Sequence, residues 1–134
     1  MTEKNNIPDN YRFTKDHEWV IRDAQNDNIV IIGISDHAQS SMGDIVHVEL
    51  PDEGEKFEVG DEVAVVESAK SASEVYAPVT GNIIEVNDHL DSHPEAINED
   101  PYNEGWLFKI ELDDPDQLDD LLSSDGYNSY LEDE

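Results

Sequence analysis

Lys70 is the only basic side chain between Lys56 and Lys109, in a chain with 34 Asp and Glu residues and a formal net charge of -27. It lies in the stretch VVESAKSASEVYAP, where Ala and Ser surround it. Small neighbours leave the ammonium group open to a large partner, and the nearby Glu67 and Glu74 favour its charged form. A nucleophilic lysine needs the opposite environment, either an apolar pocket or other cations. The residue types therefore indicate a lysine that another enzyme modifies, rather than one that performs catalysis.

The segments on either side of this lysine predict a β-hairpin. Residues 63–67 contain three Val and residues 73–77 contain Val and Tyr, which are residue types that favour strands, and residues 68–72 form the turn that connects them. Lys70 is then expected at or near the tip of the hairpin. A lysine at a hairpin tip can also serve only to keep the protein soluble. The position by itself therefore does not distinguish a modified lysine from a solubilising one.

Further short strands, separated by turn residues, are predicted along the chain. They lie at residues 18–22, 29–34 and 45–50, after Gly81, and at 106–112. The first two form a hairpin across the turn cluster DAQNDN. In the strand at 45–50, Val46, Val48 and Leu50 share one face, which predicts a half-buried strand. Short strands at this spacing are typical of an all-β sandwich or barrel.

Capping residues predict short helices between and after these strands. Ser35 is a natural N-cap and Gly43 suits the left-handed end of the same helix. Near the C-terminus, Asp114 is placed as an N-cap, with Pro115 at the first helical position and Gln117 where a capping box needs it. A second C-terminal helix is predicted at residues 124–131.

Length and composition limit the possible classes of protein. A chain of 134 residues is about one domain, and we divide it into a loose N-terminus (1–10), one domain (11–131) and an acidic tail (132–134). Having no Cys, the chain cannot form disulfides or zinc-thiolate sites. Seven Lys and Arg against 34 acids argue against binding to nucleic acid or to anionic membranes. The first residues, MTEKNNIPDN, resemble neither a signal peptide nor a transit peptide, so a cytoplasmic and bacterial protein is expected.

The segment VESAKSASEVYAPVTGNIIEVN resembles the lipoyl-attachment motif of the glycine cleavage H-protein family. FTKDHEWV, GISDHAQSSMGDIVHVELP, NEDPYNEGWLFKI and DPDQLDDLL resemble other segments of the same family, and they follow one another in the same order. Together they cover roughly residues 11–131. Matching segments in one order are far more specific than a lone lysine in a turn, so the chain is identified as a member of this family.

The resemblance implies a lipoyl-domain-like barrel-sandwich hybrid of two antiparallel sheets, with short helices and a helical C-terminus. It implies that Lys70 carries lipoate in amide linkage and that the protein is a carrier without an active site of its own. The partners implied are glycine decarboxylase with its pyridoxal phosphate, a tetrahydrofolate-dependent aminomethyltransferase, dihydrolipoyl dehydrogenase and a lipoate-attaching enzyme. A monomer is expected, because weak, steered encounters with several partners fit the strong acidity.

The resemblance further implies a cleft that protects the loaded arm. By this resemblance, Asp16, Glu18 and Glu74 are expected to line the cleft, where a carboxylate would hold the protonated amine at the end of the arm. No metal site is predicted, because Pro94 prevents a helix that would align His89 and His93.

Three alternatives remain open at the level of the sequence. The first is a lipoyl or biotinyl domain of a larger enzyme, although Ala69 and Ser71 rather than Met flank the lysine. The second is an H-like protein that mainly relays lipoate to other carriers. The third is an acidic interaction module without a cofactor, in which Lys70 is never modified.

Overall fold

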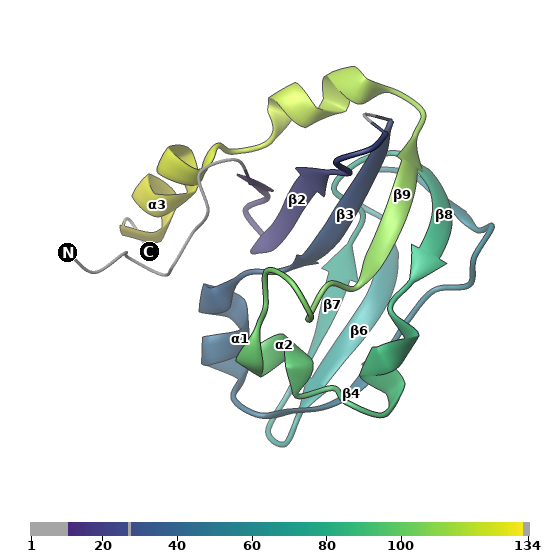
Figure 1. Cartoon of the computed structure of the whole chain (residues 1–134). Coiled ribbons are helices and arrows are strands. Elements are labelled where there is room, and N and C mark those ends of the chain that lie inside the picture. The colour runs from purple at the N-terminus through teal and green to yellow at the C-terminus, as the bar shows by residue number, and fades with distance from the viewer. Residues whose placement is uncertain (1–10, 27, 133–134) are drawn as a thin grey trace.

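The computed structural model describes residues 11–26 and 28–132, which fold into two antiparallel sheets (Figure 1). The strands are β1 (Arg12–Phe13), β2 (Glu18–Arg22), β3 (Ile29–Ile34), β4 (Ile45–Glu49), β5 (Lys56–Phe57), β6 (Glu62–Ser68), β7 (Ala72–Tyr76), β8 (Gly81–Val86) and β9 (Phe108–Leu112). The larger sheet has the order β1-β2-β3-β9-β8-β5 and the smaller has the order β4-β6-β7. The mostly-β class with two antiparallel sheets is therefore confirmed. The predicted loose segment 1–10 lies outside the described residues.

The main hydrophobic core brings the two sheets together. Val30, Ile32 and Ile110 of the larger sheet belong to the same buried cluster as Val66 of the smaller sheet. A second cluster is mainly aromatic and consists of Phe13, Trp19, Tyr102 and Tyr127. Burial of this much apolar surface stabilises the fold of a chain that has no Cys to form disulfides.

The predicted hairpin of residues 18–22 and 29–34 is confirmed as β2 and β3, in which Trp19 lies opposite Gly33. Trp19 is only 1% exposed, and its indole donates a hydrogen bond to the carbonyl of Pro101 at 2.9 Å. A Cβ atom on Gly33 would lie 2.6 Å from the indole ring. Glycine is required here because the tryptophan covers the backbone of the neighbouring strand.

The helices are α1 (Asp36–Met42), α2 (Ala96–Glu99) and α3 (Ser124–Glu132), with 3-10 turns η2 (Asp88–Asp91) and η3 (Pro115–Asp120). The prediction for α1 is confirmed, since the Ser35 hydroxyl accepts a hydrogen bond from the N–H of Ala38 and Gly43 ends the helix with φ of 82°. The predicted helix at 124–131 is confirmed as α3. No helix within the described ranges has the length and apolar character to span a membrane.

The C-terminal segment differs from the prediction at Gln117. Asp114 caps η3 as expected, accepting from the N–H of Asp116 at 3.0 Å, but the segment is a 3-10 turn rather than an α-helix. The Gln117 amide does not close a capping box, because its oxygen accepts instead from the N–H of Thr80 at 2.7 Å. A tertiary hydrogen bond has replaced the local one.

The predicted alternation of strand β4 is wrong at its first residues. Ile45 is 3% exposed and Val46 is 55% exposed, the reverse of the expected faces, whereas Val48 is buried as predicted. A bulge between Ile45 and His47 inserts one extra residue and reverses the alternation before it. The N–H of Ile45 donates instead to the side chain of Asn98 in α2, at 2.8 Å.

Candidate functional site

Lys70 lies in a tight turn between β6 and β7, as predicted. The N–H of Ser68 donates to the carbonyl of Ser71 at 2.7 Å, and the N–H of Ser71 donates back to the Ser68 hydroxyl at 3.1 Å. The N–H of Lys70 also donates to the Ser68 hydroxyl, at 3.3 Å. Ala69 and Lys70 are therefore the two central residues of a turn that Ser68 closes from both sides.

The side chain of Lys70 is exposed and lies near the end of helix α1. A Cβ atom on Gly43 would lie 3.6 Å from the Cε of Lys70, so the two residues are in contact distance. Glu67 and Glu74, the acids expected to lie nearby, make no ion pair with Lys70, and neither does any other carboxylate in residues 11–26 and 28–132. The turn fixes the backbone of Lys70, and its side chain extends from it.

A cleft of about 180 Å³ opens beside this hairpin. One wall is the turn between β1 and β2, a second is helix α1, and the third comes from β6 and β7. The lining residues are Asp16, His17, Glu18, Ile34, His37, Ala38, Ser41, Met42, Val66, Ser73, Glu74 and Val75. Met42 lines the cleft and immediately precedes Gly43, so the cleft and the end of the Lys70 side chain meet at the end of α1. All three predicted acids thus line one cleft.

Glu18 differs from the other two acids because it is buried. It is 2% exposed, and its carboxyl oxygens accept from the hydroxyl of Thr14 at 2.9 Å and from the N–H of Tyr76 at 2.7 Å. Burial raises the pKa of Glu18 from its ordinary value of 4.5 to about 7, even though these two hydrogen bonds favour the ionised form. The negative charge of Asp16 raises this pKa further.

Asp16 and Glu74 are exposed acids of the same cleft. They place negative charge where solvent enters, whereas Glu18 lies inside. The geometry can attract a cation to the cleft and hold it against a buried carboxyl group. Such a cation would favour the ionised form of Glu18.

The turn between β1 and β2 is bent at His17, which has φ of 72°. The Thr14 hydroxyl accepts from the N–H of Asp16 at 3.1 Å and from the N–H of Glu18 at 3.2 Å. A positive φ is uncommon in a residue other than glycine and costs free energy. The bent backbone and the hydroxyl of Thr14 together direct Asp16, His17 and Glu18 into one cleft.

Several residues in or next to the cleft were missed by sequence reasoning. Thr14 and Tyr76 donate hydrogen bonds to the Glu18 carboxyl group, and no local sequence pattern indicates this role. His17 and His37 lie in segments that resemble the family, and their rings are 4.7 Å apart between centroids. Their position in those segments was the one available indication.

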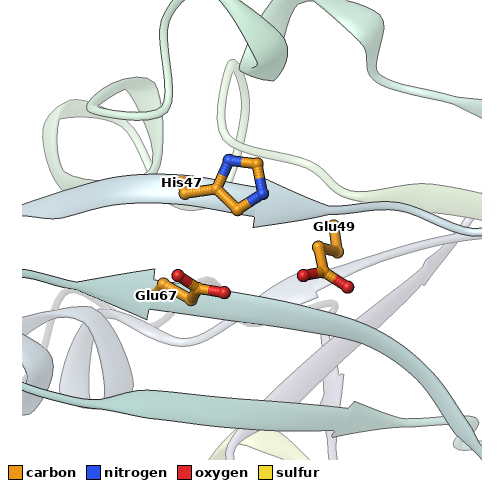
Figure 2. A group of neighbouring side chains, drawn as sticks. All are labelled: His47, Glu49 and Glu67. Atoms are coloured by element: carbon orange, nitrogen blue, oxygen red, sulfur yellow. The ribbon is translucent and has the colours of Figure 1, made fainter.

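One further group of side chains has donor atoms that could contact a cation. His47 and Glu49 of β4 and Glu67 of β6 lie with their ligand atoms within 4.8 Å of one another (Figure 2). His47 lies directly opposite Glu67 in the sheet. All three side chains lie at the surface, where acidic groups gather without an ion, so the group carries no metal assignment.

Comparison with known proteins identifies the family. A sequence model described as Glycine cleavage H-protein matches residues 11–134. A glycine cleavage system H protein from Xanthomonas euvesicatoria is 52% identical over 128 residues, which are 96% of this chain and 96% of that protein. The chain belongs to the glycine cleavage H-protein family.

Other members agree over nearly the whole chain. A glycine cleavage system H protein from Alteromonas mediterranea is 46% identical over 129 residues, which cover 96% of this chain and 98% of that protein. The crystal structure of a glycine cleavage system H protein from Mycobacterium marinum matches with a TM-score of 0.82 at 34% identity, covering 94% of this chain and 99% of that one. The family fold therefore extends over both sheets and the C-terminal segment.

The residues present fit the lipoate cofactor of this family. Attachment needs an exposed primary amine on a rigid turn, and Lys70 offers one with small neighbours on both sides. A cleft begins where the lysine side chain lies against α1. When bound, lipoate would supply a disulfide that takes up the aminomethyl group as its S–S bond breaks and that remains as a dithiol once the group has left.

Proposed function

We propose that Lys70 carries lipoate in amide linkage and that the chain serves the glycine cleavage system as its lipoyl carrier rather than as a catalyst. The observation that supports this most strongly is the exposed Lys70 amine, which makes no ion pair within residues 11–26 and 28–132 and lies on a turn beside a cleft that contains buried Glu18. The carrier domain spans residues 11–131.

The cleft acids hold the loaded end of the arm, which bears a protonated amine. Asp16 and Glu74 attract the ammonium group from solvent, and Glu18 accepts a charge-assisted hydrogen bond from it inside the cleft. With a pKa of about 7, roughly half of the Glu18 carboxyl groups are ionised near neutral pH. The approaching cation shifts the remainder to the ionised form, so the proton held by Glu18 leaves as the cation binds.

Four proteins act on this carrier. Glycine decarboxylase loads the arm, the aminomethyltransferase unloads it, dihydrolipoyl dehydrogenase reoxidises the dithiol, and a lipoate-attaching enzyme modifies Lys70. Tethering raises the effective concentration of the substrate, so none of these encounters needs to be tight. A net charge of -27 steers the monomeric carrier toward basic surfaces on its partners.

We place the protein in the bacterial cytoplasm. The relatives that support this are bacterial H proteins of nearly the same length, such as those of Xanthomonas euvesicatoria and Alteromonas mediterranea.

The decisive test is intact mass followed by peptide mapping, after incubation of the purified chain with lipoate, ATP and a lipoate ligase. We expect one lipoyl group, located on Lys70, and none on the variant Lys70→Arg. The variant Lys56→Arg is the matched control, since it alters an exposed lysine outside the hairpin. An unmodified Lys70, in a reaction that modifies a known carrier, would instead favour the acidic interaction module. Reconstitution with the partner enzymes then separates glycine cleavage from lipoate relay.

A further inference from the structure

Tyr127 of helix α3 is completely buried, although it lies seven residues from the end of the chain. Its ring stacks on that of Phe13 with centroids 4.3 Å apart and an angle of 3° between the planes. Its hydroxyl oxygen lies 2.6 Å from Nδ1 of His17 and 2.8 Å from the hydroxyl oxygen of Ser35. One hydroxyl group therefore contacts two residues that are far apart in the sequence.

These two partners belong to different walls of the cleft beside Lys70. His17 is the residue with positive φ in the turn that also presents Glu18. Ser35 is the N-cap of α1, the helix that forms the second wall. The N–H of Ser35 also donates to the carbonyl of His17, at 2.8 Å. Tyr127 thus completes a junction at which the turn, the helix and the C-terminal segment meet.

We propose that Tyr127 is a positioning residue for this cleft: its hydroxyl group holds the His17 turn and the N-terminus of α1 at a fixed separation. Its importance for the arm rests on the function proposed above, but its effect on the cleft does not depend on lipoate. The C-terminal helix is in this way part of the site, although none of its residues lines the cleft.

The physical reason is that His17 has an uncommon backbone conformation, which contacts from several elements hold in place. A strained backbone persists only where its surroundings over-determine it. Backbone pairing between Phe13 and Leu122, at 2.8 Å in both directions, brings the C-terminal segment to the start of this turn. The hydroxyl of Tyr127 then contacts the turn at its bent residue. Without it, His17 loses a buried partner and the turn gains freedom to open.

The first test uses the full chain without lipoate and the variant Tyr127→Phe, which keeps the stacked ring. Tyr11→Phe is the matched control, because the Tyr11 hydroxyl donates a 2.8 Å hydrogen bond to the carbonyl of Tyr102, outside the cleft. The measurements are thermal unfolding and an NMR titration of the Glu18 carboxyl carbon. We expect both variants to lose some thermal stability. We expect only Tyr127→Phe to lower the titration midpoint of Glu18, by about half a pH unit or more, because an open turn admits water.

A second variant keeps the test decisive if Tyr127→Phe folds poorly. His17→Asn removes the same contact, and Asn tolerates positive φ. We expect it to lower the Glu18 midpoint as Tyr127→Phe does, and we expect the double variant to add little, since both changes remove one interaction. Additive shifts, or a midpoint that neither variant moves, would overturn the positioning role.

The lipoylated protein then separates this proposal from the function on which it rests. The bound aminomethyl group should be lost several-fold faster from the isolated loaded Tyr127→Phe protein than from Tyr11→Phe. If the titration midpoint moves but this lifetime is unchanged, Tyr127 positions the cleft and the arm does not use it. If Lys70 cannot be lipoylated while the midpoint still moves, the carrier function is wrong and the positioning role stands.

Discussion

The lysine hairpin and the cleft beside it are built in different ways. Ser68, Ala69, Lys70 and Ser71 are consecutive, and hydrogen bonds among Ser68, Lys70 and Ser71 close the turn, while the N–H of Ala69 donates to the carbonyl of Asp44. The cleft is assembled from the turn at 14–18, helix α1 and the strands on either side of the hairpin, and Tyr127 joins two of its walls. The proposed attachment point is thus a local structure, whereas the cleft proposed to receive the arm is a tertiary one.

This difference implies that the two regions can be disabled separately. Substitutions in the hairpin should affect modification of the lysine and leave the titration of the cleft unchanged. Substitutions in the cleft should affect the loaded arm and the pH dependence of stability, and leave modification unchanged. The experiments below test this separation, from the largest expected effect to the smallest.

The largest effect is expected for Lys70→Arg. Arginine keeps the positive charge but cannot form the lipoyl amide, so glycine decarboxylation supported by this protein should fall to background. Circular dichroism and thermal unfolding should match the parent, because the side chain is exposed and makes no ion pair within the described residues. Lys56→Arg should retain full turnover. Turnover by the Lys70→Arg protein would mean that the attachment site lies elsewhere.

Glu18→Gln should shorten the lifetime of the aminomethyl group on isolated loaded protein by about tenfold, the effect of losing roughly 1.4 kcal/mol of interaction with the ammonium group. The amide keeps the volume of the side chain and an oxygen that can accept from Tyr76, so the cleft retains its shape. The measurement is the rate at which the bound group is released in the absence of partner enzymes. Glu74→Gln, at the exposed part of the cleft, should have a smaller effect. Equal lifetimes for parent and Glu18→Gln would remove Glu18 from arm binding.

Glu18 should also make the stability of the fold depend on pH. Its pKa is about 7 in the folded protein and close to 4.5 in the unfolded chain, so the unfolded chain releases this proton first as the pH rises. The associated stability is fully present below the unfolded pKa and is lost as the pH rises through the folded one. The loss amounts to about 3 kcal/mol in the free energy of unfolding.

Urea unfolding at about pH 5 and about pH 8 checks this prediction. Carboxylates elsewhere in this acidic chain also titrate, so the informative quantity is the difference between the parent and Glu18→Gln. The variant should lose much less stability between the two pH values than the parent does. Glu74→Gln should behave as the parent does. If Glu18→Gln and the parent lost the same free energy of unfolding between the two pH values, ionisation of Glu18 would not destabilise the folded state.

The smallest effect is expected for Ser68→Ala. The change removes the hydroxyl group that accepts from the N–H groups of Lys70 and Ser71, at a cost of about 1 kcal/mol in the free energy of unfolding. Lipoylation of Lys70 should slow several-fold because the turn is less ordered, while the Glu18 titration stays as in the parent. A change in that titration would contradict the separation of hairpin and cleft.

Much of the fold follows from local sequence. The hairpin around Lys70, the hairpin of β2 and β3, the N-cap at Ser35 and the end of α1 at Gly43 are all confirmed. In each case the residues that define the structure are neighbours in the chain, so their types and spacing determine the conformation. Several segments resemble the family in the same order, and this resemblance extended the prediction from single elements to the whole fold.

Where the prediction failed, a distant residue had replaced a local partner. Asn98 binds the start of β4, where a bulge puts Val46 on the exposed face, and Thr80 binds Gln117 in place of a capping box. Alternation and capping patterns assume that neighbours in sequence supply the contacts. These patterns take no account of a hydrogen-bond partner that comes from a distant part of the chain.

The sequence by itself determined the hairpin that presents Lys70, and it predicted this lysine as the attachment point and Asp16, Glu18 and Glu74 as the acids of the cleft. Only the tertiary structure decided that Glu18 is buried while Asp16 and Glu74 remain exposed, and that Tyr127 reaches His17 across 110 positions. Burial and long-range hydrogen bonds depend on how strands and helices pack. The pKa of a carboxyl group, unlike the position of a turn, is therefore a property of the folded molecule.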